Sequence, residues 1–225
     1  MSTPSAVLFD LDGTLCTYER PGSEILEAAF DRLGLEPRFE MADFHERYLE
    51  FLPASADGFD LYERTFTALC DEHDLDPSLG ERLNRAFHDE RDPDDLVALE
   101  GAHEVLTTFE AEYRLGLVTN GHPELQRHKL RTLAFPDVFE TVVFAGYDTP
   151  AKPDPEPFRR ALTAVETSPA EAVYVGNHPS VDVAGARAAG LRAAWLADAD
   201  RRPSPRPDYV LESLHELRAP PWRGD

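Results

Sequence analysis

Two carboxylates stand two positions apart close to the N-terminus. Asp10 and Asp12 follow the apolar run Ala6–Phe9 and precede Gly13-Thr14. Side chains two positions apart on an extended chain project to the same face, so both carboxylates are expected at one point, where they need a cation or a shared proton. An isolated Asp-x-Asp pair is usually a solvated turn, but an apolar strand before it and Gly-Thr after it favour a functional site.

The same pattern of an apolar run that ends in a polar turn occurs twice more. Leu115–Val118 precedes Thr119-Asn120-Gly121, and Ala172–Val175 precedes Gly176-Asn177. Helical patterns follow these turns, and strands that alternate with helices predict an α/β fold with a doubly wound parallel sheet. Ligands bind outside the carboxyl ends of such strands, where all three turns would gather. The helices are expected at 124–133, 155–165 and 181–189, and further short strands at 141–144, 193–196 and 209–211.

Residues 18–99 interrupt this alternation. They carry amphipathic helical patterns without strand patterns, which predicts an inserted helical domain. Pro21-Gly22 and residues 91–94 are suitable hinges, because Pro and Gly punctuate elements and polar linkers tolerate motion. The α/β core domain is then expected to comprise residues 1–17 and 100–225. The helices of the insert are expected at 24–33, 44–52, 61–73 and 79–89.

Asp10-Leu11-Asp12-Gly13-Thr14 resembles the first motif of the haloacid-dehalogenase-like hydrolases. The resemblance implies a Rossmann-like core in which Asp10 attacks phosphorus and forms an aspartyl-phosphate. It also implies that Asp12 protonates the leaving alcohol and then activates water. The helical insert resembles the C1-type cap of the family, which closes over the site and contacts the leaving group.

Two later segments resemble the second and third motifs of this family. Thr119-Asn120 matches a motif in which a hydroxyl and a backbone N–H bind phosphate oxygens, although an Asn-Gly turn alone is an ordinary turn signal. Lys152, which precedes Pro153, matches a lysine that neutralises the nucleophile and the transferring phosphoryl group. The chain uses Arg for nearly all its basic residues, and its only other lysine is Lys129, so a retained Lys152 indicates a need for a compact ammonium charge.

The fourth segment, Gly176–Asp182, departs from the family pattern. Asn177 stands where an Asp is usual, whereas Asp182 is retained. The resemblance implies a Mg²⁺ site made of the Asp10 carboxylate, the Asp12 backbone carbonyl, Asp182 and waters, with Asn177 as a possible neutral ligand. Oxygen-rich sites that keep water suit Mg²⁺.

Composition excludes several classes of partner. The chain of 225 residues carries 43 Asp and Glu against 22 Lys and Arg, a formal charge of -21 that would repel nucleic acids and anionic membranes. It has no apolar stretch near the roughly 18 residues of a membrane helix and no signal-peptide pattern, so a cytoplasmic location is expected. The acids are dispersed along the chain, which is typical of a halophilic protein in a high-salt cytoplasm. The oligomeric state stays open.

Several functions are compatible with these motifs. The favoured one is a Mg²⁺-dependent phosphatase that hydrolyses a small phosphorylated metabolite, because a cap of this size restricts large substrates. A 2-haloacid dehalogenase is the second, since Asn177 resembles that branch, but Asp12 argues against it. A phosphotransferase or phosphomutase differs only in the acceptor of the phosphoryl group. A noncatalytic binding protein with the same fold is the last alternative.

Overall fold

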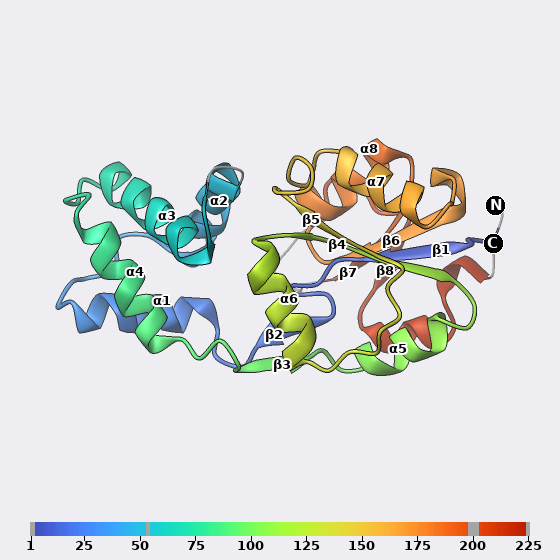
Figure 1. The fold of residues 1–225 in the computed structure, drawn as a ribbon, viewed down its shortest axis with the longest axis horizontal. Helices are drawn as coiled ribbons and strands as arrows, with labels where there is room; N and C mark the ends of the chain where they lie inside the picture. The colour runs from blue at the N-terminus through green and yellow to red at the C-terminus, as the bar shows by residue number, and fades with distance from the viewer. Residues whose placement is uncertain (1–2, 53–54, 198–202, 224–225) are drawn as a thin grey trace. The chain divides into compact units, whose positions relative to one another are not determined.

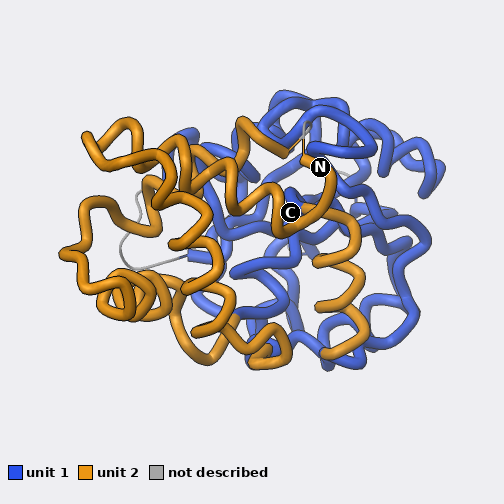
Figure 2. Tube along the Cα trace, turned by 60° about the vertical axis from the view of Figure 1, so that its left-hand side comes forward, with its two compact units in different colours: residues 1–17, 97–121, 133–225 blue, residues 18–96, 122–132 orange. Residues whose placement is uncertain are grey.

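The computed structural model describes residues 3–52, 55–197 and 203–223, and the chain divides into two compact units (Figures 1 and 2). Unit 1 consists of residues 1–17, 97–121 and 133–225, and unit 2 of residues 18–96 and 122–132. Residues 122–132 therefore group with unit 2, although they follow a strand of unit 1 in the chain.

Unit 1 is built on a parallel six-stranded sheet, which confirms the predicted α/β fold with a doubly wound sheet. Its strand order is β5-β4-β1-β6-β7-β8. All residues of β1, β6 and β7 are buried, as expected for parallel strands that are covered on both faces. The strands are β1 (Ala6–Phe9), β4 (Arg114–Asn120), β5 (Thr141–Ala145), β6 (Ala172–Gly176), β7 (Arg192–Leu196) and β8 (Tyr209–Leu211).

The strand register aligns the three polar turns. Phe9, the last residue of β1, pairs with Leu117 on β4 and with Val175 on β6. Asp10 directly follows Phe9, so it lies between β4 and β6 where β1 ends. Three turns that are far apart in the sequence thereby begin at one edge of the sheet.

Helices cover both faces of this sheet (Figure 1). Helices α7 (Glu156–Ala164) and α8 (Ala184–Ala189) lie on one face, and α5 (Ala102–Phe109) lies on the other. Phe158 of α7 packs edge-on against the ring of Tyr174 in β6, with centroids 4.8 Å apart. Short turns complete the unit: the 3₁₀ segments η2 (Pro169–Glu171), η4 (Leu214–Arg218) and η5 (Pro221–Arg223) and the π-helical segment η3 (Pro179–Val183).

Unit 2 is helical, as predicted for the insert. Each of its first four helices has one apolar face, and these faces enclose a core rich in aromatic rings, including Phe30, Phe44, Phe66 and Phe87. Asp57 caps one helix by accepting a hydrogen bond of 2.8 Å from the backbone N–H of Asp60. The helices are α1 (Gly22–Arg32), α2 (Met41–Phe51), α3 (Gly58–Glu72), α4 (Leu79–Glu90) and α6 (Pro123–Thr132).

Two short strands lie where the chain passes between the units. β2 (Cys16–Tyr18) pairs with β3 (Leu96–Ala98) in a two-stranded sheet. The sequence pattern did not predict either strand. In the described part of the chain, every helix is too short or too polar to cross a membrane.

Candidate active site

The loop after β1 forms a tight turn that places Asp10 at its base. The backbone N–H of Asp10 donates to the carbonyl of Val175 on β6 at 2.9 Å, so Asp10 continues the sheet pairing. Gly13 adopts a φ of +74°, a backbone conformation that residues with a Cβ rarely adopt. Its N–H donates to the carbonyl of Cys16 at 2.7 Å. The Asp10 residue is buried, whereas Asp12 is only partly so.

Lys152 is the centre of the buried polar cluster. Its Nζ lies 2.8 Å from Asp10 Oδ1 and 2.8 Å from Asp182 Oδ1. Its third contact, also at 2.8 Å, is the hydroxyl oxygen of Tyr174. The Lys152 side chain is only 2% exposed. Its ammonium group therefore pairs with two carboxylates where almost no water reaches it. The fold thus brings together three of the residues that the motifs predict.

The second predicted segment supports this lysine through its backbone. Asn120, the last residue of β4, donates from Nδ2 to the carbonyl of Lys152 at 3.1 Å and accepts from the Lys152 N–H at 2.9 Å. Its side chain therefore fixes the loop that carries the ammonium group. Thr119 is buried one residue earlier, at the end of the strand.

The fourth segment presents Asp182 to the cluster. Asp182 Oδ2 accepts a hydrogen bond of 2.9 Å from the backbone N–H of His178, which leaves Oδ1 for Lys152. Gly176 allows this approach, because a Cβ on it would stand 2.6 Å from the Cβ and Cγ of Asp182. The backbone carbonyl of Asn177 accepts a hydrogen bond of 2.9 Å from Trp195 Nε1.

Asn177 itself packs against the first loop. A Cβ on Gly13 would lie 2.3 Å from Asn177 Nδ2, so the amide group rests directly on the backbone of that turn. The two ends of the site, the turn after β1 and the turn after β6, are therefore in contact. Asn177 lies beside the turn that carries Asp12, but the sequence-predicted ligand role of its amide stays a prediction.

Burial acts in opposite directions on the pKa values of Asp10 and Lys152, but both pKa values are raised on balance. Burial, together with the negative charge of Asp182, raises the pKa of Asp10 to about 7, although Lys152 opposes the shift. Burial alone would lower the pKa of Lys152, but Asp10 and Asp182 together raise it. Two carboxylates on one ammonium leave the cluster short of positive charge.

The donor set suits a divalent metal ion such as Mg²⁺. Asp10 and Asp182 supply buried carboxylate oxygens, and two carboxylates on one ammonium group make a further cation electrostatically favourable there. Within the described ranges, no three His, Cys, Asp or Glu side chains are grouped as metal ligands. A metal bound at this point would therefore depend on backbone, amide or water oxygens for its remaining ligands.

Tyr174 is the residue of the cluster that the sequence patterns did not reveal. It lies within the apolar run of β6, where its ring resembles one more core side chain. The available signal is the hydroxyl group itself, because a tyrosine in a fully buried strand needs a hydrogen-bond partner.

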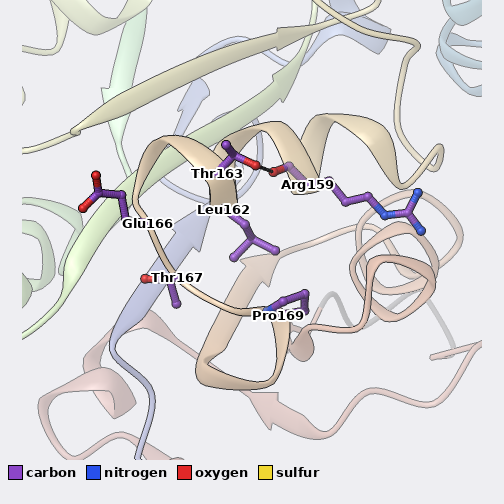
Figure 3. Close-up of a pocket in the computed structure, with 6 residues that line it drawn as sticks. All are labelled: Arg159, Leu162, Thr163, Glu166, Thr167 and Pro169. Carbon is purple, nitrogen blue, oxygen red and sulfur yellow. Dashed lines mark hydrogen bonds between the residues drawn. The ribbon is translucent and has the colours of Figure 1, made fainter.

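A hollow on the surface of unit 1 lies away from these residues, along the C-terminal half of α7 and the loop that follows (Figure 3). None of the sequence-predicted site residues lines it. It is lined by Arg159, Leu162, Thr163, Glu166, Thr167 and Pro169.

Comparisons with known proteins identify the family of the chain. The family model of the haloacid dehalogenase-like hydrolases matches residues 4–190. Phosphoserine phosphatase from Thermus thermophilus is 38% identical over 75% of this chain and 68% of its own length. Glyceraldehyde 3-phosphate phosphatase from Pyrococcus furiosus is 28% identical over 94% of this chain and 90% of its own. The crystal structure of a 2-haloacid dehalogenase from Pseudomonas syringae pv. Tomato DC3000 has a TM-score of 0.59 and 27% identity, and the match covers 96% of this chain and 97% of that one. The chain therefore belongs to the haloacid dehalogenase-like hydrolase family, and it is a hydrolase with phosphatase relatives.

Proposed function

We propose that the chain is a Mg²⁺-dependent phosphatase that hydrolyses a small phosphorylated metabolite through an aspartyl-phosphate intermediate. The observation that carries this proposal is the position of Asp10, a carboxylate held at the end of β1 by the ammonium group of Lys152 at 2.8 Å. Relatives that act on phosphoserine and on glyceraldehyde 3-phosphate support the size and class of the substrate.

The residues divide the reaction into two transfers. A carboxylate oxygen of Asp10 attacks phosphorus, and the ester P–O bond breaks as Asp12 gives its proton to the leaving alkoxide. Asp12, now ionised, takes a proton from water, whose oxygen attacks the same phosphorus atom. The Asp10–phosphorus bond breaks, and inorganic phosphate and free Asp10 result. Lys152 neutralises the negative charge near Asp10 in both steps, and Thr119 and Asn120 bind phosphate oxygens.

The proposed metal site uses the Asp10 carboxylate, the Asp12 backbone carbonyl, Asp182 and Asn177. When bound, Mg²⁺ would neutralise charge on the phosphoryl oxygens. The residues of the chain hold the Asp10 carboxylate at the edge of the sheet, shield it from bulk water and transfer the protons.

Residues 18–99 are proposed to be the cap, with residues 1–17 and 100–225 as the core domain. Residues 18–96 of this proposed cap belong to the helical unit 2, and a helical cap can close over the site, exclude water and contact the leaving group. A cytoplasmic location belongs to the same proposal.

One observation favours a second function, the hydrolysis of 2-haloacids. Asn177 replaces the usual acid of the fourth motif and rests on the turn of Gly13, and a dehalogenase is among the similar structures. Asp12 argues for the phosphatase, because an acid that protonates an alcohol has no use when the leaving group is a halide ion.

The deciding experiment measures phosphate release from phosphorylated metabolites, beginning with phosphoserine and glyceraldehyde 3-phosphate, and halide release from 2-haloacids. Both assays use molar salt and Mg²⁺. Phosphate release by the wild type should disappear in Asp10→Asn and fall on the order of 10²-fold or more in Asp12→Asn. Halide release without phosphate release would select the dehalogenase, and an unchanged rate in Asp10→Asn would remove the nucleophile assignment.

A further inference from the structure

The hydroxyl group of Tyr174 occupies a central position beneath Lys152. It lies on β6, is fully buried, and its oxygen accepts a hydrogen bond from Lys152 Nζ at 2.8 Å. Its own proton is donated to the backbone carbonyl of Val118 on β4 at 2.9 Å, which is shorter than the 3.2 Å to Asp182 Oδ1. The hydroxyl group therefore joins β6 to β4 across β1, which lies between them in the sheet.

The tyrosine differs from the other two acceptors of the ammonium group. A lysine ammonium has three donors, and Asp10, Asp182 and Tyr174 accept one each. The proposed reaction changes the charge and bonding of Asp10, and Asp182 is a proposed metal ligand. Tyr174 takes part in neither event, so it is the acceptor that can hold Nζ in place throughout.

The ring of Tyr174 is fixed as firmly as its hydroxyl group. It lies in the middle of a fully buried strand and packs at 74° against the ring of Phe158, with centroids 4.8 Å apart. Lys152 Nζ is 5.4 Å from the centroid of the same tyrosine ring. A tyrosine packed in this way holds Lys152 Nζ at a fixed position.

We propose that Tyr174 is a positioning residue, which acts through Lys152 by holding its ammonium group against the attacking oxygen of Asp10. This inference rests on the proposed function, because it assigns Lys152 a part in catalysis. Rate depends steeply on such placement, since a displacement of about 1 Å can cost on the order of 10²-fold.

The first test is Tyr174→Phe, which keeps the ring and its contact with Phe158 and removes the hydroxyl group. We expect kcat to fall about 10- to 100-fold, whereas KM changes less than about twofold. Tyr113→Phe is the matched control. Tyr113 is also a buried tyrosine of unit 1, and its hydroxyl group contacts Trp222 and Arg223 at 3.4 Å each, apart from the site. The control should lose thermal stability and keep its kcat.

The second test observes the lysine directly. Lys129 and Lys152 are the only lysines, so ¹⁵N labelling of lysine Nζ gives two ammonium signals, which Lys129→Arg assigns. In the wild type we expect the Lys152 signal to exchange slowly with water, and in Tyr174→Phe we expect it to shift or to exchange faster. The wild-type spectrum needs no variant to fold, and a Lys152 ammonium group in fast exchange with water would by itself overturn the proposal.

The outcomes separate this inference from the proposed function. If the wild type is active and a folded Tyr174→Phe is equally active, the positioning role of Tyr174 is contradicted and the proposed function is not. If kcat falls by the same factor in Tyr113→Phe, the loss comes from a general loss of stability, and the positioning role of Tyr174 is again contradicted. A wild type without phosphate release would contradict the proposed function. If it releases halide instead, the same kcat comparison applies, because Asp10 is the nucleophile in both reactions.

Discussion

Lys152 holds two carboxylates at 2.8 Å each, and this imbalance of charge governs the behaviour of single residues in the site. A buried ammonium group can neutralise one carboxylate, and the second remains costly unless it binds a proton or another cation. Burial, followed by the negative charge of Asp182, raises the pKa of Asp10, although Lys152 opposes the shift. Metal and proton are therefore expected to compete for the same position.

This competition predicts a pH dependence of stability without metal. The pKa of Asp10 is about 7 in the folded protein against 3.8 for the ordinary side chain, so between these values the folded state binds the proton more tightly. Stability from this group is present at low pH and is lost as pH rises through that window. Residue 10 does not titrate in Asp10→Asn. The free energy of unfolding of this variant, relative to that of the wild type, should therefore rise by on the order of 1 to 3 kcal/mol from about pH 5 to about pH 8. Denaturant unfolding in chelator measures both curves. Added Mg²⁺ should shrink the gap, and parallel curves would show that Asp10 is ionised throughout.

Asn177 gives a second prediction at this scale. It replaces an anionic oxygen by an amide beside the first turn, and hard cations favour carboxylate ligands. Asn177→Asp should therefore lower the Mg²⁺ concentration that gives half-maximal activity by about tenfold, the change expected from one added ligand charge. Turnover need not rise, because another carboxylate also repels the incoming phosphate.

A Mg²⁺ titration of both proteins at one fixed high ionic strength measures this change. Thr107→Asp, which adds the same charge at an exposed position of α5, controls for the added charge. An equal or weaker affinity for Mg²⁺ in Asn177→Asp would place residue 177 outside the electrostatic reach of the metal.

The positions of the motif residues could be predicted because each lies at or after the end of a strand, in a fixed order along the chain. The contacts of Lys152 with Asp10 and Asp182 follow from a register that brings those strand ends together. Tyr174 could not be predicted in the same way, because a tyrosine within an apolar run is indistinguishable from a core residue until its hydroxyl partner is known. The hydrogen bonds of Asn120 with the backbone of Lys152 were hidden for a similar reason, since they join segments 32 residues apart.

At the scale of elements, periodicity predicted the long helices and the buried strands well. Helices expected at 61–73 and 79–89 are observed at Gly58–Glu72 and Leu79–Glu90. Strands β2 and β3 escaped prediction because three residues carry too little alternation to distinguish a strand from a loop. The grouping of α6 with unit 2 also escaped, because it depends on tertiary contacts that local sequence does not express.

Arg91 joins three elements of unit 2 and supports a prediction about their stability. Directly after α4, its guanidinium group donates to the hydroxyl of Tyr62 on α3 at 3.0 Å and to that of Tyr18 on β2, and it stacks 4.4 Å from the Tyr18 ring centroid. Arg91→Ala should lower the free energy of unfolding by about 2 kcal/mol, because it removes charge-assisted hydrogen bonds and leaves two hydroxyl groups without their donor.

Arg85→Ala is the control on the same helix. Arg85 is 68% exposed and pairs with Glu81 at 2.5 Å, and such a surface pair contributes less than about 1 kcal/mol. Denaturant unfolding of the two variants makes the comparison. Equal losses of stability would mean that the tyrosine contacts of Arg91 contribute no more than a surface ion pair.

At the scale of the whole molecule, net charge dominates. Acidic residues outnumber basic ones by 43 to 22, so arginines can neutralise only part of the acids, and their ion pairs are mostly at the surface. The excess negative charge repels itself in the compact state more than in the unfolded chain. Charge of this kind affects stability and solubility without bearing on the reaction.

This repulsion leads to a prediction about salt. Charges interact over about 10 Å at 0.1 M salt and over about 3 Å at 1 M, so molar salt should remove most of the repulsion between neighbouring acids. We expect folding and activity to require salt on the order of 1 M, with a thermal midpoint that rises steeply up to that concentration. KCl and NaCl should act alike, because screening depends on ionic strength, whereas sucrose at equal osmolality should not replace them. Circular dichroism and phosphate release, measured along one salt series, test both parts. A protein that is fully stable and active in dilute buffer would show that its charge of -21 is tolerated without screening, and the high-salt interpretation of the acidic surface would fail.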